Sequence, residues 1–276
     1  MMLTQAEILT KLTINHDTKK CFIFDLDGTL IFDKSPLDVD TNDILRKIIN
    51  AGHEVIFATG RPFRDFQTVM PSWTYSGSLI LFSGALCMQA EEITSSIYMP
   101  DKNVIDLVNM CHSHKLHYNV DNSHNYYHPD LLHSFYEILD ATVGTYKART
   151  LDEIFNGSTH KILVLDHTVE EMFREYTDEN NLIIKVHSFD KWFDVVPDGV
   201  NKFNAVLPYI TNYNKDDVFV FGNDFNDFEL LLNFANSTLF GDIKPLCEIA
   251  AINISYDEYR FDNFKLVINT IIETIE

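Results

Sequence analysis

The strongest constraint on the fold comes from ten residues near the N-terminus, Cys21–Leu30, which read CFIFDLDGTL. The first four are apolar, and a short apolar run of this kind predicts a strand buried on both faces. Two carboxylates, Asp25 and Asp27, follow directly. Ligands of open α/β sheets bind beyond the carboxyl ends of the strands, so a binding site is expected here. Alternate residues of an extended chain face one side, so both acids can address one site unless the chain turns at Leu26.

This pair of acids suggests a particular chemistry. Neighbouring carboxylates repel each other unless a cation neutralises them or one of them keeps a proton. One could attack a phosphoryl group while the other transfers protons, with an oxygen-ligated Mg²⁺ screening their charge. The alternative is a strand that ends in a polar turn, where Asp and Gly are favoured. The pair alone leaves both interpretations open.

Composition restricts the function classes. The chain has 276 residues, 46% of them hydrophobic, which is enough for two domains or one large one with a sizeable core. The formal net charge of −20 disfavours broad binding to nucleic acid or to anionic membranes. The first 20 residues lack the apolar block of a signal peptide, and no apolar run approaches a membrane span of about 20 residues. Scattered cysteines without a Cys-x-x-Cys pair predict reduced thiols in the cytoplasm: Cys21, Cys87, Cys111 and Cys247.

Two further predicted strands end in small polar turns. Residues 53–58 form the first, and Thr59-Gly60-Arg61 follows it; a predicted helix over 41–51 makes this a parallel crossover. The Thr59 hydroxyl and nearby amides could hold a phosphate oxygen, while Arg61 could add charge or steady the loop. Thr-Gly turns are common, so the tripeptide alone is weak evidence. Residues 79–82 form the second strand, which ends in Ser83-Gly84-Ala85.

The C-terminal third contains two more polar segments. Asn201 is placed to cap a helix that runs to about residue 210, and Lys202 then lies in the first turn, against the helix dipole. This conflict suggests that Lys202 reaches a phosphate or the nucleophilic carboxylate, although an exposed lysine is the simpler alternative. A predicted strand over 217–221 leads into Gly222–Asp227, GNDFND, which is rich in oxygen ligands suited to Mg²⁺. Asp and Asn are also ordinary helix caps.

The middle of the chain, from about residue 86 to 189, is predicted to be an inserted α/β domain. Helices are expected over 101–114, 131–140 and 169–177, and strands over 161–165 and 182–186. Six histidines lie between residues 112 and 133, and we interpret them as ordinary surface or substrate-facing residues because their spacing matches no standard metal site. Tyr126, Tyr127 and His128 could line a substrate pocket or pack as strand residues. Beyond the insert, a strand over 192–196 and helices over 228–233 and 261–275 are expected, besides a short one over 3–12.

In this order, four motifs resemble those of the haloacid-dehalogenase-like hydrolases, specifically the Cof-type phosphatase branch. They are Asp25–Thr29, Thr59–Arg61, Gly199–Lys202 and Gly222–Asp227, and the resemblance spans nearly the whole chain. It implies an α/β fold with a Rossmann-like parallel-sheet core, residues 1–84 and 190–276. It also implies an inserted α/β cap domain, residues 85–189.

The resemblance also implies roles for individual residues. Asp25 would be the nucleophile that forms an aspartyl-phosphate, and Asp27 the general acid/base. The phosphoryl group would contact Leu26 through its amide, Thr59, Gly60, Lys202 and Asn226. Mg²⁺ would be held by Asp25, the main-chain carbonyl of Asp27, Asn223, Asp224 and Asp227. Weaker candidates on the substrate side are Arg61, Ser83, Tyr126 and His128.

Two departures from the family pattern affect these expectations. Asn223 stands where the family usually has a metal-binding Asp, so metal affinity is expected to fall unless Asp224 or Asp227 substitutes for it. Ser83 stands where the family favours Asn, which shortens the reach toward substrate. The expected function is a cytoplasmic, Mg²⁺-dependent hydrolase of small phosphomonoesters such as sugar phosphates. The alternatives are a weakly active phospho-ligand-binding or regulatory protein and a sugar-phosphate mutase of the same fold.

Overall fold

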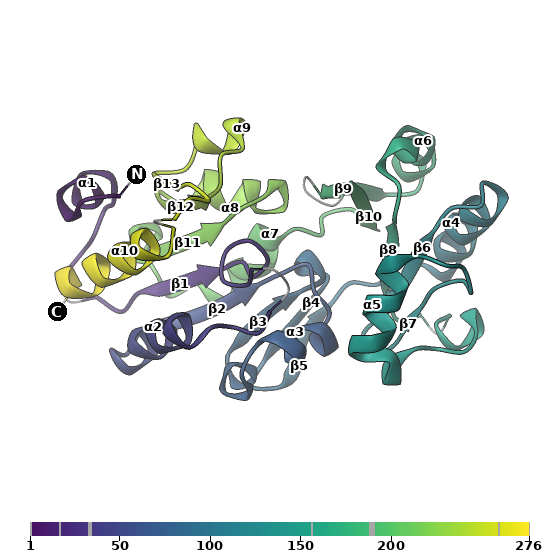
Figure 1. The fold of residues 1–276 in the computed structure, drawn as a ribbon, viewed down its shortest axis with the longest axis horizontal. Coiled ribbons are helices and arrows are strands. Elements are labelled where there is room, and N and C mark those ends of the chain that lie inside the picture. The colour runs from purple at the N-terminus through teal and green to yellow at the C-terminus, as the bar shows by residue number, and fades with distance from the viewer. Residues whose placement is uncertain are drawn as a thin grey trace.

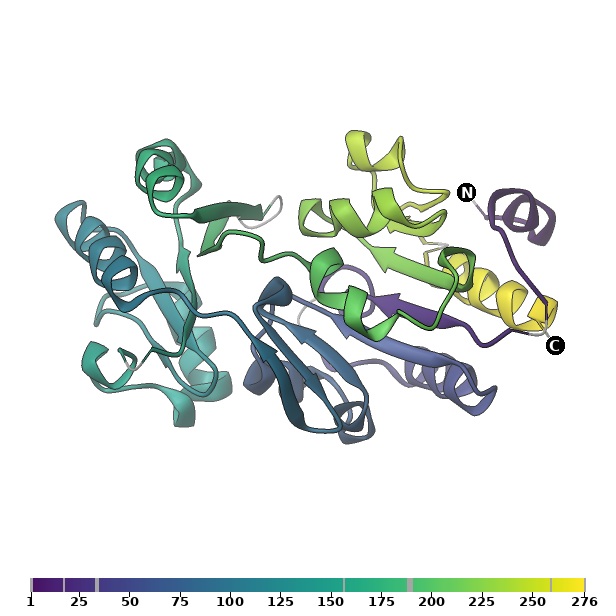
Figure 2. The ribbon, with the colours of Figure 1, turned by 180° about the vertical axis from the view of Figure 1, so that it is seen from behind.

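The chain forms two α/β lobes, each built on its own sheet, as Figure 1 shows. A computed structural model describes residues 2–16, 18–32, 35–155, 157–187, 191–258 and 260–275. Both ends of the chain lie in the larger lobe, at the end remote from the smaller one (Figure 2). The smaller lobe is therefore an insertion into the larger one. We call them the cap and the core.

The core lobe is built on a mostly parallel sheet. Within the described residues its strand order is β13-β12-β11-β1-β2-β3-β4-β5, parallel from β13 to β3 and antiparallel from β3 to β5. The strands are β1 (Cys21–Phe24), β2 (Glu54–Ala58), β3 (Ser78–Leu81), β4 (Leu86–Gln89), β5 (Glu92–Ser96), β11 (Val218–Gly222), β12 (Asn236–Phe240) and β13 (Ile252–Ile254). Strand β1 lies between β11 and β2, so the three loops that follow these strands are neighbours.

Helices cover both faces of the core sheet, because alternate strand residues point to opposite faces. Phe22 and Phe24 pack with α1 (Gln5–Lys11), α2 (Val39–Asn50), α3 (Phe63–Val69) and α10 (Arg260–Ile275). Cys21 and Ile23 pack with α7 (Lys202–Val206), α8 (Phe228–Asn233) and α9 (Lys244–Cys247). This double cover explains why β1 is apolar at every position and fully buried.

The cap is built on an antiparallel sheet in the order β7-β6-β8-β10-β9. Its strands are β6 (Tyr118–Asn122), β7 (Tyr126–Tyr127), β8 (Thr159–Val164), β9 (Leu182–His187) and β10 (Trp192–Pro197), and its helices are α4 (Asp101–Ser113), α5 (Ser134–Val143) and α6 (Glu170–Glu179). Val120, Ile162 and Val195 lie in the apolar cluster that includes α4 and α6. The residues that alternate with them include the polar residues Asn119, Asp121, Lys161 and Asp194, which belong to the opposite face together with the apolar Leu163 and Val196.

Most predicted elements are present within a few residues of the expected bounds, and α8 spans the predicted residues 228–233. Two assignments differ from the expected division. Strands β4 and β5 fall within the expected cap range 85–189 but pair with β3 in the core sheet. Strand β10, expected in the core, pairs with β8 and β9 in the cap. The expected junction at residues 189 and 190 lies outside the described residues. From the sheet pairing, we propose a cap that spans about residues 97–197.

Candidate active site

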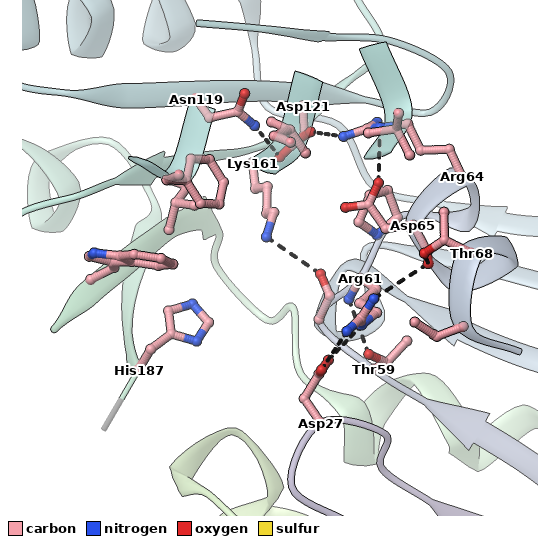
Figure 3. A pocket seen from close by; sticks show the side chains of 18 of the residues that line it. Asp27, Thr59, Arg61, Arg64, Asp65, Thr68, Asn119, Asp121, Lys161 and His187 are labelled. Atoms are coloured by element: carbon pink, nitrogen blue, oxygen red, sulfur yellow. Dashed lines mark hydrogen bonds and ion pairs between the residues drawn. The ribbon is translucent and has the colours of Figure 1, made fainter. Parts of the chain in front are cut away.

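Loops from three neighbouring strands of the core line one cavity. Asp25 follows β1, Thr59 follows β2 and Asn223 follows β11, and all three contact the same space of about 310 Å³. The cap closes its other side. Figure 3 shows this arrangement, with Asp27, Thr59 and Arg61 from the core facing Asn119, Asp121 and Lys161 from the cap.

Lys202 joins two buried carboxylates beneath this cavity. Its Nζ lies 2.6 Å from Asp25 Oδ1 and 2.7 Å from Asp227 Oδ1, and the side chain is fully buried. Asn201 caps α7, accepting the Asn204 amide at 2.7 Å, and so starts the helix where Lys202 can point inward. Lys202 thus contacts Asp25, one of the two partners that the sequence suggested for it. The helix dipole disfavours a lysine at this position, and the ion pairs with Asp25 and Asp227 offset that cost.

The pKa values reflect a site with more buried negative than positive charge. Burial raises the pKa of Asp25, and Lys202 opposes this effect only in part, so that the value reaches about 7. Burial lowers the pKa of Lys202, but Asp227 and Asp25 outweigh it and the pKa is raised. Lys202 is therefore charged at neutral pH. A second cation near Asp25 would favour its ionised form.

Asp27 is placed differently from Asp25, because it lies next to a turn over residues 28–30. The carbonyl of Leu26 accepts the amides of Thr29, Leu30 and Ile31 at 2.8–3.1 Å. Asp25 is thus left buried, whereas the Asp27 side chain is 52% exposed at the cavity. Arg61 holds Asp27 through two hydrogen bonds, Nε to Oδ2 at 2.7 Å and Nη2 to Oδ1 at 2.6 Å. Both acids line the cavity.

Asp227 holds the loop after β11 in place. Its Oδ1 is bound to Lys202, while its Oδ2 accepts the amides of Asn223 at 2.9 Å and Asp224 at 3.4 Å. Gly222 allows this close packing, since a Cβ there would lie 2.6 Å from the Asp227 side chain. Both Asp227 oxygens are therefore committed to the protein. Asn226 lines the cavity, and its Oδ1 is buried without a hydrogen-bond partner.

The loop after β2 supplies the remaining core wall. Thr59 Oγ1 accepts the Arg61 amide at 3.1 Å, and the Thr59 carbonyl accepts the amide of Ser83 at 2.8 Å. Ser83 is buried with φ of 55°, so the turn after β3 is pressed against this loop rather than extended toward the cavity. Thr59 and Gly60 line the cavity; Ser83 supports them.

The oxygen donors around Asp25 fit a hard divalent cation. Asp25 Oδ2 has a long contact of 3.4 Å with the Thr29 hydroxyl, and Asn223 and Asp224 line the cavity beside it. The unpartnered Asn226 Oδ1 and the raised pKa of Asp25 also suit a site that takes up positive charge. Within the described part of the chain, no three His, Cys, Asp or Glu side chains converge into a metal site by themselves. A cation here would therefore use amide and main-chain oxygens besides carboxylates.

The cap contributes a second set of charged groups. Lys161 Nζ lies 3.2 Å from Asp194 Oδ2 and 3.4 Å from the carbonyl of Gly60, so it spans the two lobes. His187 Nε2 lies 3.1 Å from the same Asp194 oxygen. Burial raises the pKa of Asp194, but Lys161 and His187 outweigh it and bring the value to about 2. Trp192 and Phe135, with ring centroids 5.1 Å apart, form an apolar wall beside them.

A buried ion pair crosses from core to cap. Arg64 of α3 contacts the Asp121 carboxylate of β6, and both side chains are nearly inaccessible. Arg64 also donates from Nη1 to the carbonyl of Asn125 at 3.3 Å, and Asn119 Nδ2 donates to Asp121 at 2.8 Å. Removal of one partner would leave a buried charge uncompensated.

Tyr126 and His128, the cap residues considered for a substrate pocket, lie away from the cavity. Both are buried and contact Asp140, at 2.7 Å from the Tyr126 hydroxyl and 2.9 Å from His128 Nε2. The sequence interpretation overlooked Lys161, Asp194 and Arg64. The usable signal for the first two is their position in the strands: Lys161 and Asp194 are next to Ile162 and Val195, which pack in the cap core, so each lies on the opposite sheet face.

Comparison with known proteins agrees with this fold. Residues 22–257 match the family model described as haloacid dehalogenase-like hydrolase. The 5-amino-6-(5-phospho-D-ribitylamino)uracil phosphatase YitU of Bacillus subtilis is 24% identical over 237 residues, which cover 78% of this chain and 84% of that protein.

Solved structures resemble more than nine tenths of the chain. SMU.1108c from Streptococcus mutans has a TM-score of 0.76 at 14% identity, covering 93% of this chain and 99% of its own. The HAD subclass IIB sugar phosphatase BT4131 has a TM-score of 0.71 at 18% identity, covering 94% of this chain and all of its own.

The fold and the site thus define a capped α/β hydrolase. The chain belongs to the haloacid dehalogenase-like hydrolase family, in its Cof-type phosphatase branch. It is an enzyme. Across the described ranges, no helix combines the length and apolar character needed to cross a membrane.

Proposed function

We propose that this protein is a Mg²⁺-dependent hydrolase of small phosphomonoesters that acts through an aspartyl-phosphate on Asp25. The observation that carries the proposal is the pairing of Asp25 with Lys202 at 2.6 Å, beneath a cavity that Thr59 and Asp27 also line. A buried carboxylate suits nucleophilic attack on phosphorus when a fixed cation and hydrogen-bond donors for the phosphoryl oxygens lie beside it.

Each side chain has a defined task in this mechanism. Asp25 Oδ2, the oxygen not bound to Lys202, attacks the phosphoryl group. Lys202 stabilises the charge on the transferred oxygens, together with the Thr59 hydroxyl and the Asn226 side chain. Asp27 protonates the leaving alkoxide and then takes a proton from the water that hydrolyses the acyl phosphate. Asp27 is suited to this exchange because it is half exposed at the cavity, while Asp25 is buried.

Mg²⁺, when bound, would neutralise charge between Asp25 and an anionic ester. Asp25, the main-chain carbonyl of Asp27, Asn223 and Asp224 are the residues proposed to hold it. Asp227 is proposed to act from behind them, because Lys202 and two main-chain amides occupy its oxygens.

The cap side of the cavity suits an uncharged, hydrogen-bonding leaving group with an apolar face. Lys161 and His187 are both tied to Asp194, which offsets their charge, and Trp192 supplies a flat wall. Sugar phosphates and phosphorylated polyols that carry a ring are the first classes to test. The similarity to a phosphatase named for a ribitylamino-uracil phosphate and to a sugar phosphatase supports the same choice.

The experiment is a phosphate-release screen of sugar and polyol monophosphates with and without Mg²⁺. The parent protein should release phosphate only with the metal, and Asp25→Asn should reduce the rate by about 10³-fold or more, as expected for loss of a nucleophile. Hydrolysis at the parent rate by Asp25→Asn would end the proposed mechanism.

The same screen distinguishes the alternatives. A binding or regulatory protein would retain phosphoesters without turnover even at high Mg²⁺. A mutase would move the phosphoryl group between positions of a bisphosphate rather than release it.

We also place the protein in the cytoplasm. Its four cysteines are free thiols, three of them buried, which suits a reducing compartment.

A further inference from the structure

Among the side chains proposed to hold Mg²⁺, that of Asn223 is the uncharged one, and the structure shows what holds it in place. Its Nδ2 donates to the hydroxyl of Tyr256 at 3.2 Å. Tyr256 lies in the segment between β13 and α10, 33 residues further along the chain. The same hydroxyl donates to the main-chain carbonyl of Gly28 at 2.9 Å, in the loop that follows Asp27.

The direction of these two hydrogen bonds determines how the amide is turned. A carbonyl only accepts, so the single proton of the Tyr256 hydroxyl goes to Gly28. Toward Asn223 the hydroxyl is then an acceptor, and only the NH₂ group of the amide can donate to it. The amide therefore presents Nδ2 to Tyr256 and turns its carbonyl oxygen to the other side. Since Asn223 lines the cavity with Asp25 and Asp224, that oxygen is the atom left for the cavity.

Two further features keep this arrangement fixed. Gly28 has φ of +83°, and a Cβ there would lie 2.1 Å from Asn223 Nδ2 and 2.9 Å from the Tyr256 hydroxyl, so only glycine leaves room. The Tyr256 ring packs edge-on against Phe32 with centroids 6.3 Å apart, and the Arg260 guanidinium lies 3.5 Å from the Phe32 ring centroid. The tyrosine is therefore anchored at its ring as well as at its hydroxyl.

We propose that Tyr256 is a positioning residue that orients Asn223 so that its amide oxygen, not its nitrogen, serves the divalent cation. An aspartate needs no such partner because both of its oxygens are ligands, whereas a flipped asparagine would present NH₂ to a cation. The Tyr256 hydroxyl thus compensates for the neutral side chain at position 223. This inference rests on the proposed metal-dependent function, but it can be tested without turnover.

The test is a double-mutant cycle read by metal binding alone. Mn²⁺ serves as the probe for the Mg²⁺ site, with free Mn²⁺ measured by electron paramagnetic resonance and Mg²⁺ added as competitor. Tyr256→Phe keeps the ring and removes the hydroxyl, and we expect it to weaken Mn²⁺ binding about 5- to 10-fold. Asn223→Asp should tighten binding, because it adds a charged oxygen ligand. When Asn223→Asp is already present, adding Tyr256→Phe should cause no loss.

The outcomes separate the possible roles of Tyr256. Equal weakening with and without Asn223→Asp would mean that Tyr256 only supports the loop, and no weakening by Tyr256→Phe in the otherwise unchanged protein would overturn the proposal outright. Tyr213→Phe is the matched control, since it removes a tyrosine hydroxyl bound to Glu54 at 2.7 Å, away from the cavity. It should leave Mn²⁺ binding unchanged.

A second measurement needs no variant at position 256. In the parent protein, the side-chain NH₂ protons of Asn223 should exchange with water more slowly than those of an exposed asparagine, as monitored by NMR. Exchange at the exposed rate would contradict the proposal. Phosphate release by the parent reports on the function separately, so a failed hydrolysis screen with the expected Mn²⁺ results would reject the function and keep the positioning role.

Discussion

Arg61 donates two hydrogen bonds to the Asp27 carboxylate beside the cavity, from Nε to Oδ2 at 2.7 Å and from Nη2 to Oδ1 at 2.6 Å. Such a bidentate pair fixes the carboxylate in position and orientation, which a single point contact does not. Asp27 is the proposed proton donor to the leaving group, so Arg61 would position the carboxyl group that donates this proton.

Loss of Arg61 should therefore reduce turnover more than substrate binding. We expect Arg61→Met to lower kcat by about 10- to 100-fold, within the range of general acid–base effects, with a smaller change in KM. Arg61→Lys keeps the charge but loses the bidentate geometry. Its kcat should lie between those of Arg61→Met and the parent. Steady-state kinetics on one phosphomonoester measures both constants. An unchanged kcat in Arg61→Met would show that Asp27 needs no such support.

Lys202 should be essential for stability as well as for activity. Its removal in Lys202→Met leaves Asp25 and Asp227 facing each other in a buried site, with an expected loss of about 3–5 kcal/mol in the free energy of unfolding. Adding Asp25→Asn removes one of the two stranded charges and should recover part of that loss. Urea denaturation of the parent, the single variant and the double variant measures these differences. Equal stability of the single and double variants would contradict a shared buried charge network.

The pair Arg64–Asp121 should control how firmly the cap sits on the core. Arg64→Met strands a buried Asp121 and is expected to destabilise the protein by about 3–5 kcal/mol, whereas the paired change Arg64→Met with Asp121→Leu should cost less than Arg64→Met alone. Lys102→Met is the control, because Lys102 forms an exposed pair with Asp106 that contributes little. Hydrogen exchange of α3 and β6 amides, compared among these proteins, reports whether the loss is confined to the contact between the lobes.

The parts of the fold predicted from sequence are those that depend on local pattern. The apolar runs of β1 and β11 predict buried strands, and the capping side chain of Asn201 predicts the start of α7. The sequence pattern did not predict which of the two sheets a strand joins. Trp192–Pro197 has the same strand pattern whether it joins the core or the cap, and only its antiparallel pairing with β8 and β9 places it in the cap.

The site was predictable to the extent that strand ends determine it. Asp25, Thr59 and Asn223 follow adjacent parallel strands, so their convergence follows from topology. The contacts of Lys161 with Asp194 and Gly60, and of Tyr256 with Asn223, join residues that are far apart in the chain, and local periodicity carries no information about them. The turn over residues 28–30 is local, but the apolar pattern does not specify its hydrogen bonds to the carbonyl of Leu26.

His187 should titrate above its ordinary range because of Asp194. Burial lowers its pKa, but the Asp194 carboxylate at 3.1 Å outweighs it and the pKa is raised. A histidine whose pKa is raised by folding stabilises the protein fully below its unfolded value of about 6.5, and the contribution is lost as pH rises through the folded pKa. NMR titration should show the pKa of His187 dropping below that unfolded value in Asp194→Asn, because burial and the positive charge of Lys161 both lower it. The control substitution Asp166→Asn should leave the pKa of His187 unchanged. An unchanged pKa of His187 in Asp194→Asn would refute the pairing.

Gly28 and Gly52 form a matched pair that separates backbone strain from steric conflict. Both have positive φ, +83° and +86°, so alanine at either position carries a similar conformational cost of about 1–2 kcal/mol. At Gly52 a Cβ meets nothing within 4 Å, whereas at Gly28 it would lie 2.1 Å from Asn223 Nδ2. Gly28→Ala should therefore destabilise the protein by about 1–3 kcal/mol more than Gly52→Ala in urea denaturation. It should also weaken Mn²⁺ binding, because the displaced amide can no longer hold its bond to Tyr256, while Gly52→Ala should leave Mn²⁺ binding intact. Equal effects of the two substitutions would mean that the loop moves aside freely and that Asn223 is not held where the structure places it.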